Sequence, residues 1–119
     1  MQQVRTMDVF RFAKIPMRAN DPTRRYRIVR GEEDVTVGRL EIGGDVPDGD
    51  SVVLTVDCRA VLAETERESV LSTARRFLDE LVAGWGHQVA EVPGAREWAP
   101  QPDGVHRMRI EYQVVCANL

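Results

Sequence analysis

Lysine, cysteine and long apolar runs are nearly missing from this sequence. Of the 16 basic residues in the 119-residue chain, 15 are arginine and only Lys14 is lysine. The two cysteines are too few for the disulfide framework of a small secreted domain. No run of about 18 apolar residues occurs, so we expect no membrane-spanning helix. Residues 1–12 lack the apolar segment of a secretory signal. These absences predict a cytoplasmic protein, or a virion protein if the gene belongs to a phage.

The residues that most often bind metal ions are few, and their spacing fits no ligand pattern. Cys58, His87, His106 and Cys116 match neither the C-x₂-C nor the H-x₃-H spacing of zinc sites. Both cysteines fall at inward positions of alternating strands, which predicts buried, reduced thiols. A disulfide between them stays open as an alternative, if the two strands are neighbours. We predict no metal ion and no cofactor.

An acidic cluster, Asp45, Asp48 and Asp50, lies in a glycine-rich turn. A calcium loop of the EF-hand type that begins at Asp45 or Asp48 needs a glutamate at its twelfth position, where this chain has Val56 or Arg59. Turn chemistry accounts for the cluster without a bound ion.

Catalytic motifs are absent as well. No G-x-S-x-G sequence surrounds any serine, and the double glycine Gly43-Gly44 precedes acidic residues that repel phosphate. Neighbouring carboxylates occur at Glu32-Glu33 and Asp79-Glu80, on a predicted turn and on the solvated side of a predicted helix. We predict no catalytic residue, and keep a small enzyme with a site assembled in three dimensions as one alternative.

Alternation of apolar and polar residues predicts most of the chain as strands. The segments concerned are 9–15, 25–29, 35–42, 51–62, 87–92 and 106–116. In the third of them the apolar phase shifts around Gly38, which indicates a β-bulge.

One amphipathic helix is predicted between the fourth and fifth strands. Thr65-x-x-Glu68 has the form of a capping box, apolar residues recur at helical spacing from Val70 to Leu81, and Gly84 ends the pattern. The order β-β-β-β-α-β-β predicts a single α+β domain, residues 1–119, with a mainly antiparallel sheet of about six strands and the helix on one face. This order is similar to that of small phage tail-completion proteins and of secretion chaperones, without matching residues.

One helix of about 20 residues covers only part of a sheet of about six strands. Either the sheet curls on itself, or another copy of the chain covers the rest of its apolar face. We therefore expect a homo-oligomer.

Charge is divided unevenly along the chain, although the formal total is only −3. Residues 1–30 carry a formal charge of +6, and residues 31–119 carry −9. The basic part can face a polyanion, or the acidic part of the same fold or of another copy. Ion pairs between neighbouring strands are the simplest alternative.

Strand phase places several arginines on the sheet face away from the helix: Arg25, Arg27, Arg59, Arg107 and Arg109. Four of them form a candidate nucleic-acid face: Arg25, Arg27, Arg107 and Arg109. Asp57 and Glu111 share that face, both tyrosines are predicted to point inward, and the isoelectric point is about 5.4. Nucleic-acid binding is therefore the second hypothesis.

Trp98 lies in a proline-rich loop, where apolar cover is scarce. Tryptophan and arginine are common anchors of protein interfaces, although Trp98 can instead fold back over the sheet edge. We predict an interface at Arg24, Arg25, Arg27 and Trp98. The first hypothesis is a non-enzymatic subunit that self-associates, with a structural or adaptor role in a phage, secretion or other assembly. The arginine-for-lysine bias itself is typical of a high-GC bacterium.

Overall fold

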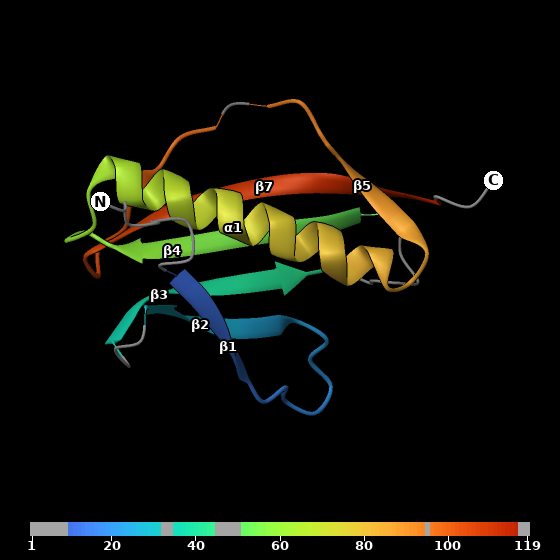
Figure 1. The fold of residues 1–119 in the computed structure, drawn as a ribbon, viewed down its shortest axis with the longest axis horizontal. Helices are drawn as coiled ribbons and strands as arrows, with labels where there is room; N and C mark the ends of the chain where they lie inside the picture. The colour runs from blue at the N-terminus through green and yellow to red at the C-terminus, as the bar shows by residue number, and fades with distance from the viewer. Residues whose placement is uncertain (1–9, 32–34, 45–50, 95, 117–119) are drawn as a thin grey trace, which may run out of the picture.

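The computed structural model describes residues 10–31, 35–44, 51–94 and 96–116, which form an antiparallel sheet with a helix packed on one face (Figure 1). The elements are β1 (Phe10–Ile15), β2 (Arg24–Arg30), β3 (Val35–Gly43), β4 (Ser51–Arg59), α1 (Glu64–Ala83), β5 (His87–Glu91), β6 (Ala99–Pro100) and β7 (Val105–Cys116). The strand order is β1-β2-β3-β4-β7-β5, and the short β6 pairs with β7 beyond the end of β5. The predicted α+β class and the antiparallel sheet are confirmed.

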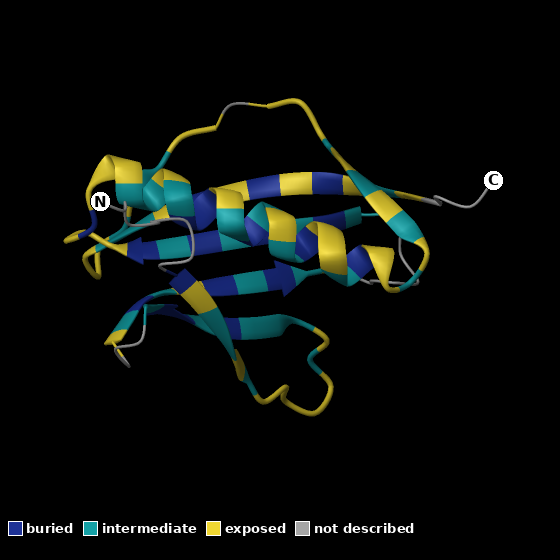
Figure 2. Cartoon of the chain, in the orientation of Figure 1, coloured by how far each residue is buried: buried dark blue, intermediate teal, exposed yellow. Residues whose placement is uncertain are grey.

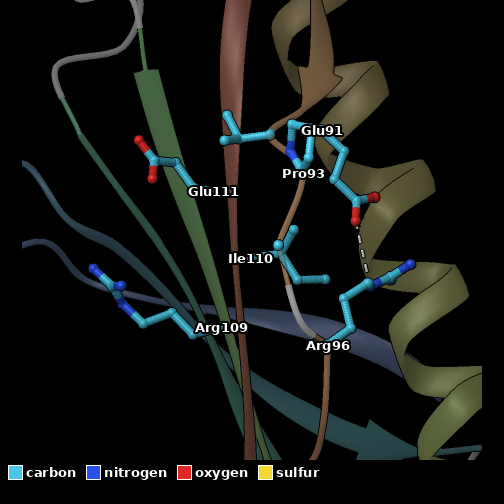
Figure 3. A pocket seen from close by; sticks show the side chains of 8 residues that line it. Glu91, Pro93, Arg96, Arg109, Ile110 and Glu111 are labelled. Atoms are coloured by element: carbon cyan, nitrogen blue, oxygen red, sulfur yellow. Dashed lines mark ion pairs between the residues drawn. The ribbon is translucent and has the colours of Figure 1, made fainter.

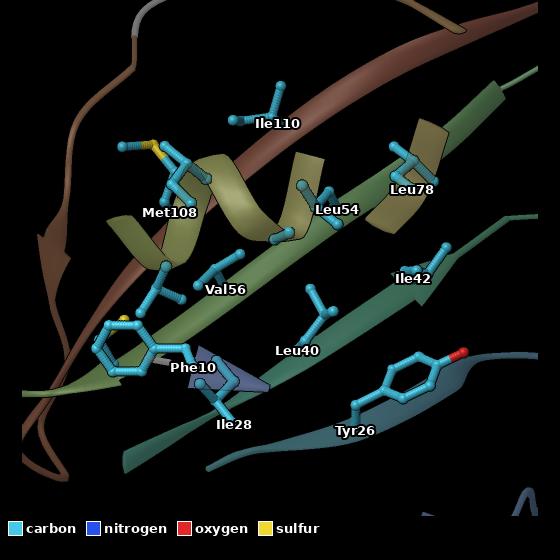
Figure 4. Close-up of a cluster of buried hydrophobic side chains, with 14 of the residues drawn as sticks. Phe10, Tyr26, Ile28, Leu40, Ile42, Leu54, Val56, Leu78, Met108 and Ile110 are labelled. Atoms are coloured by element: carbon cyan, nitrogen blue, oxygen red, sulfur yellow. The ribbon is translucent and has the colours of Figure 1, made fainter. Parts of the chain in front are cut away.

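The core lies between α1 and the sheet face turned toward it. Buried and exposed residues alternate along β4 and β7 (Figure 2), as expected for strands with one face packed and one face solvated. The packed face buries large apolar side chains of four central strands against α1 (Figure 4), among them Tyr26, Ile28, Leu40, Ile42, Leu54, Val56, Met108, Ile110 and Tyr112. Phe12 and Tyr26 meet Phe77 of α1 edge to face, with ring centroids 5.2 and 5.0 Å apart.

The sheet curls around α1, so one helix covers its apolar face (Figure 1). The large apolar side chains that are exposed in the described residues are scattered over loops and strand ends: Met17, Val35, Val61, Val92 and Val115. The apolar face of the described sheet therefore needs no second copy to cover it. Self-association stays a prediction, and its support now comes from charge.

The predicted bulge at Gly38 is confirmed. The register between β2 and β3 shifts between Ile28 and Val29, and Gly38 lies opposite Ile28. A Cβ atom on Gly38 would overlap the carbonyl oxygen of Asp57 on β4, so only glycine fits this close approach of two strands. Beyond the bulge, Arg39 and Glu41 point away from α1.

Two predicted boundaries are wrong. β4 ends at Arg59, so Leu62 is not on a strand, although its side chain is buried where the chain turns into α1. The helix begins at Glu64, and the carboxylate of Glu66 accepts a hydrogen bond of 2.8 Å from the backbone N–H of Ala63. Thr65 therefore lies within the first turn instead of capping it.

As far as the described residues go, the structure contains no helix with the length and apolarity needed to cross a membrane.

Candidate interaction surface

The sheet face turned away from α1 is here called the open face. Register and alternation assign to it the charged side chains Arg11, Arg25, Arg27, Arg39, Glu41, Asp57, Arg59, Arg107, Arg109 and Glu111. Seven arginines and three carboxylates give the strand residues of this face a formal charge of +4, and two loop carboxylates lie beside them: Asp21, paired with Arg25, and Asp103, in the hollow that Arg107 lines. Because the whole chain carries −3, the rest of the sequence carries −7. Of that −7, the described residues outside the open face carry −1, and the residues that the structure does not describe carry −6. Among the described residues, the surplus of basic charge therefore lies on the open face.

The arginines of the N-terminal third are split between the two faces. Arg25 and Arg27 lie on the open face, as predicted from their phase. Arg24 lies on the α1 side, with its guanidinium 5.3 Å from the ring centre of Trp85. Arg30 also lies on the α1 side, where it forms an ion pair of 2.9 Å with Glu66. The basic N-terminal third is therefore not one continuous surface.

A row of four charged residues crosses the open face from β2 to β7. Arg27 lies opposite Arg39, Arg39 opposite Asp57, and Asp57 opposite Arg107. The two carboxylate oxygens of Asp57 accept hydrogen bonds of 2.7 and 3.0 Å from Arg107. Arg27 donates to Thr36. One carboxylate thus stands among three guanidinium groups, and it is bonded to Arg107.

A second row holds its charges differently. Arg25 forms ion pairs with Asp21, at 2.8 Å, and with Glu41, at 3.4 Å. Hydrogen bonds from the Arg25 side chain and the Thr23 backbone lower the pKa of Asp21 to about 2. Arg109 closes the row on β7, opposite Thr55. Arg25 is therefore occupied within the fold.

Three arginines of the open face remain available to a partner: Arg39, Arg59 and Arg109. All three are exposed, and none has a hydrogen bond or ion pair with another described residue. Arg39 and Arg59 border a shallow hollow of about 380 Å³, whose lining also includes Gly38 of the bulge and the carboxylates Glu41, Asp57 and Asp103. Unpaired guanidinium groups beside a hollow suit carboxylate or phosphate groups.

The open face has no aromatic side chain among the described residues. Phe10, Phe12, Tyr26 and Tyr112 all belong to the packed face and contact the core. Proteins that hold single-stranded nucleic acid usually stack bases on such rings. The candidate nucleic-acid residues Arg25, Arg27, Arg107 and Arg109 do share the open face, but they form a purely electrostatic surface.

Trp98 folds back on the helix side, which was the alternative to its being exposed. Its indole N–H donates a hydrogen bond of 2.8 Å to Glu68, and the Arg67 guanidinium lies 5.7 Å from its ring centre. A hollow of about 490 Å³ lies beside it, here called the Trp98 hollow. Its lining consists of Glu64, Arg67, Glu68, Leu71, Arg96, Glu97, Trp98 and Met108. Of the four predicted interface residues, Arg25 and Arg27 therefore lie on one face, and Arg24 and Trp98 on the other.

A smaller hollow of about 190 Å³ lies between β7 and the residues that follow β5. Arg109 and Glu111 project from β7 away from α1, whereas Glu91 and Arg96 lie on the α1 side and form an ion pair of 3.4 Å (Figure 3). These four side chains do not converge on one point, so the hollow resembles no acid–base site.

The cysteines are too far apart for a disulfide within the chain. Cys58 lies opposite His106, and Cys116 lies opposite His87, ten positions further along β7. At about 3.3 Å per residue this separates the two cysteine positions by about 33 Å, against about 6 Å in a disulfide. The same register keeps the two histidines apart, and no metal-ligand cluster occurs among the described residues.

Two acidic groups named from the sequence lie outside the described residues: the cluster of Asp45, Asp48 and Asp50, and the pair Glu32-Glu33.

The Cys58–His106 neighbour pair has the wrong electrostatics for a nucleophile. His106 is directly opposite Cys58, but burial raises the pKa of the Cys58 thiol to about 12, against a smaller opposing effect of Arg67. The thiol therefore stays protonated at neutral pH, and a thiol is a weak nucleophile. This pair gives no support to the enzyme alternative.

Comparison of the chain with protein-family models, with curated proteins and with solved structures gives no match. The geometry of the two faces is therefore the evidence on function.

Proposed function

We propose that this chain is a non-enzymatic assembly subunit that self-associates through its open face. The observation that carries the proposal is the formal charge of +4 on the strands of that face, against −1 on the other described residues. Arg39, Arg59 and Arg109 contribute three of its charges and have no carboxylate partner among the described residues. Complementary charge speeds encounter and selects the partner surface.

Like charge disfavours the simplest dimer. If two copies met open face to open face, +4 would stand against +4, and arginines would face arginines. Another surface of the partner must therefore supply the carboxylates. This suits a structural or adaptor subunit, whose copies or partners meet through unlike surfaces.

Light scattering across a salt series tests self-association. Between about 0.01 M and 1 M salt the Debye length falls from about 30 to about 3 Å, so a contact between charged surfaces weakens steeply. We expect a molar mass above that of the 13.4-kDa monomer at low salt, which falls toward the monomer as salt is added. A monomer at every salt concentration would contradict the proposal.

Nucleic-acid binding is the second candidate, because the same +4 face can contact phosphates. The absence of aromatic side chains on the described open face predicts weak binding without sequence preference. Fluorescence anisotropy with labelled single- and double-stranded DNA and RNA at low salt tests it. Binding that Arg107→Gln/Arg109→Gln weakens would support this candidate, and no binding at low salt would end it.

A further inference from the structure

We infer that the surface met by the open face is the Trp98 hollow of a second copy, so that copies associate head to tail. The inference rests on the proposed function and names its partner surface. The hollow combines an apolar floor, an aromatic ring and carboxylates at its rim. These are the groups that hold an arginine side chain, because its stem is apolar and its planar head carries charge.

The positive groups of the Trp98 hollow are already engaged. Arg67 donates a hydrogen bond of 3.0 Å to the carbonyl oxygen of Leu62 and lies over the Trp98 ring. Arg96 forms an ion pair with Glu91 at 3.4 Å.

The carboxylates of the hollow are less engaged. Glu64 and Glu97 are exposed and have no hydrogen bond or ion pair from their side chains to another described residue. Glu68, also exposed, accepts one hydrogen bond from the Trp98 indole through one oxygen. The hollow therefore offers acceptors to an incoming cation.

The open face offers matching groups. Arg39 and Arg59 are exposed at one hollow of that face and lack carboxylate partners among the described residues. A guanidinium can bond a carboxylate with two parallel N–H groups and also stack on an indole ring. Arg39 and Arg59 meeting Glu64, Glu97 and Trp98 of another copy would satisfy both sides of the contact.

The two surfaces lie on opposite sides of the sheet. The Trp98 hollow is lined from α1 and from Met108 of the packed face, whereas Arg39 and Arg59 point away from α1. One copy therefore cannot bring its own open face to its own hollow. A contact of this kind joins unlike surfaces and leaves one of each exposed, so it builds rings or filaments.

Two charge-reversed variants test the inference by mixing. Arg39→Glu/Arg59→Glu reverses two charges of the open face and leaves the Trp98 hollow unchanged. Glu64→Lys/Glu97→Lys reverses two charges of the hollow and leaves the open face unchanged. Each alone is expected to self-associate at least about tenfold more weakly than the wild type. Mixed at low salt, the two variants should associate again, because the intact open face of one meets the intact hollow of the other and the two reversed surfaces also carry opposite charges. Sedimentation velocity distinguishes the restored assemblies from the monomers that each variant gives alone.

Matched controls keep the charge changes but move them elsewhere. Arg18→Glu/Arg76→Glu alters two exposed arginines that lie on a loop and on α1, and Asp79→Lys/Glu80→Lys alters the far end of α1. Both controls should still self-associate. Cooperative urea unfolding verifies that every variant folds. If the hollow variant does not fold, Glu64→Gln/Glu97→Gln removes the same two charges without adding new ones.

The outcomes separate the inference from the proposed function. Wild-type association that the hollow variants leave unchanged would overturn the inference and leave the proposed function standing. Two monomeric variants that do not pair on mixing would also overturn it, because a head-to-tail contact requires that pairing. A wild type that never associates would overturn both.

Discussion

Asp57 on β4 binds Arg107 on β7 through two hydrogen bonds and leaves Arg39, its neighbour on β3, unbonded. The N···O distances to Arg107 are 2.7 and 3.0 Å. A carboxylate held in this bidentate way has little capacity left for a second guanidinium. The choice of Arg107 over Arg39 thus keeps Arg39 free to meet a partner.

Removal of the Asp57 charge should destabilise the fold modestly. Asp57→Asn is expected to lower the free energy of unfolding by about 0.5–1 kcal/mol, because Arg107 is partly exposed to solvent but the pair has bidentate geometry. Glu111→Gln, on the same face but without a described side-chain partner, should change it by less than about 0.5 kcal/mol. Urea unfolding of both variants measures the difference. An equal effect of the two substitutions would show that the Asp57–Arg107 pair adds no stability.

The bulge glycine should not tolerate a side chain. Gly38→Ala places a Cβ against the Asp57 carbonyl oxygen, so we expect a loss of about 1–3 kcal/mol in the free energy of unfolding. Gly43, on the same strand, has no neighbouring atom within 4 Å of the position that a Cβ would take, and it serves as the matched control. Gly43→Ala should be close to neutral in thermal unfolding. A similar melting temperature for both variants would contradict the close approach of β3 and β4.

The Cys58 thiol should be inert in the folded protein. With its pKa raised to about 12 by burial, about one molecule in ten thousand carries the thiolate at pH 8. In a Cys116→Ser background, reaction with a disulfide reagent should therefore be very slow until urea unfolds the chain. Rapid labelling of native Cys58 would contradict its burial and would reopen the enzyme alternative.

Asp21 should make stability depend on pH only in strong acid. Its folded pKa of about 2 lies below its ordinary value of 3.8, so its contribution is complete above about pH 4 and is lost as the pH falls toward 2. Arg25→Gln removes the main cause and should move the pKa of Asp21 back toward 3.8. Carboxyl titration by NMR reads this pKa directly. An unchanged pKa in Arg25→Gln would show that the Thr23 backbone alone holds the carboxylate.

Most of the fold follows from the sequence because each strand has one face packed against the core and one face exposed to solvent. Alternation from Ser51 onward and from His106 to Cys116 fixed both the strands and the face on which their arginines lie. The helix start was less predictable, because Ala63 carries no capping side chain and Glu66 acts through its own carboxylate. Local sequence gives weak evidence for such ends.

The candidate surface was only partly predictable. Arg39 is not among the residues predicted for the open face. Leu40 and Ile42 point inward after the bulge, so strand alternation alone places Arg39 on the outward side. The sequence does not show that the predicted interface residues are divided between two faces. Arg24 and Trp98 lie on the helix side, whereas Arg25 and Arg27 lie on the open face. This division depends on contacts between distant segments, such as Trp98 with Glu68, for which strand and helix periodicity carry no signal.

Assembly through the open face is tested most directly by sedimentation velocity of Arg39→Glu/Arg59→Glu beside Arg18→Glu/Arg76→Glu at the same low salt. Both variants change the net charge by the same amount, but only the first alters the open face. Association through the open face predicts that the first is monomeric and that the second associates like the wild type. Equal association of the two variants would contradict the claim that this protein assembles through the open face of its sheet.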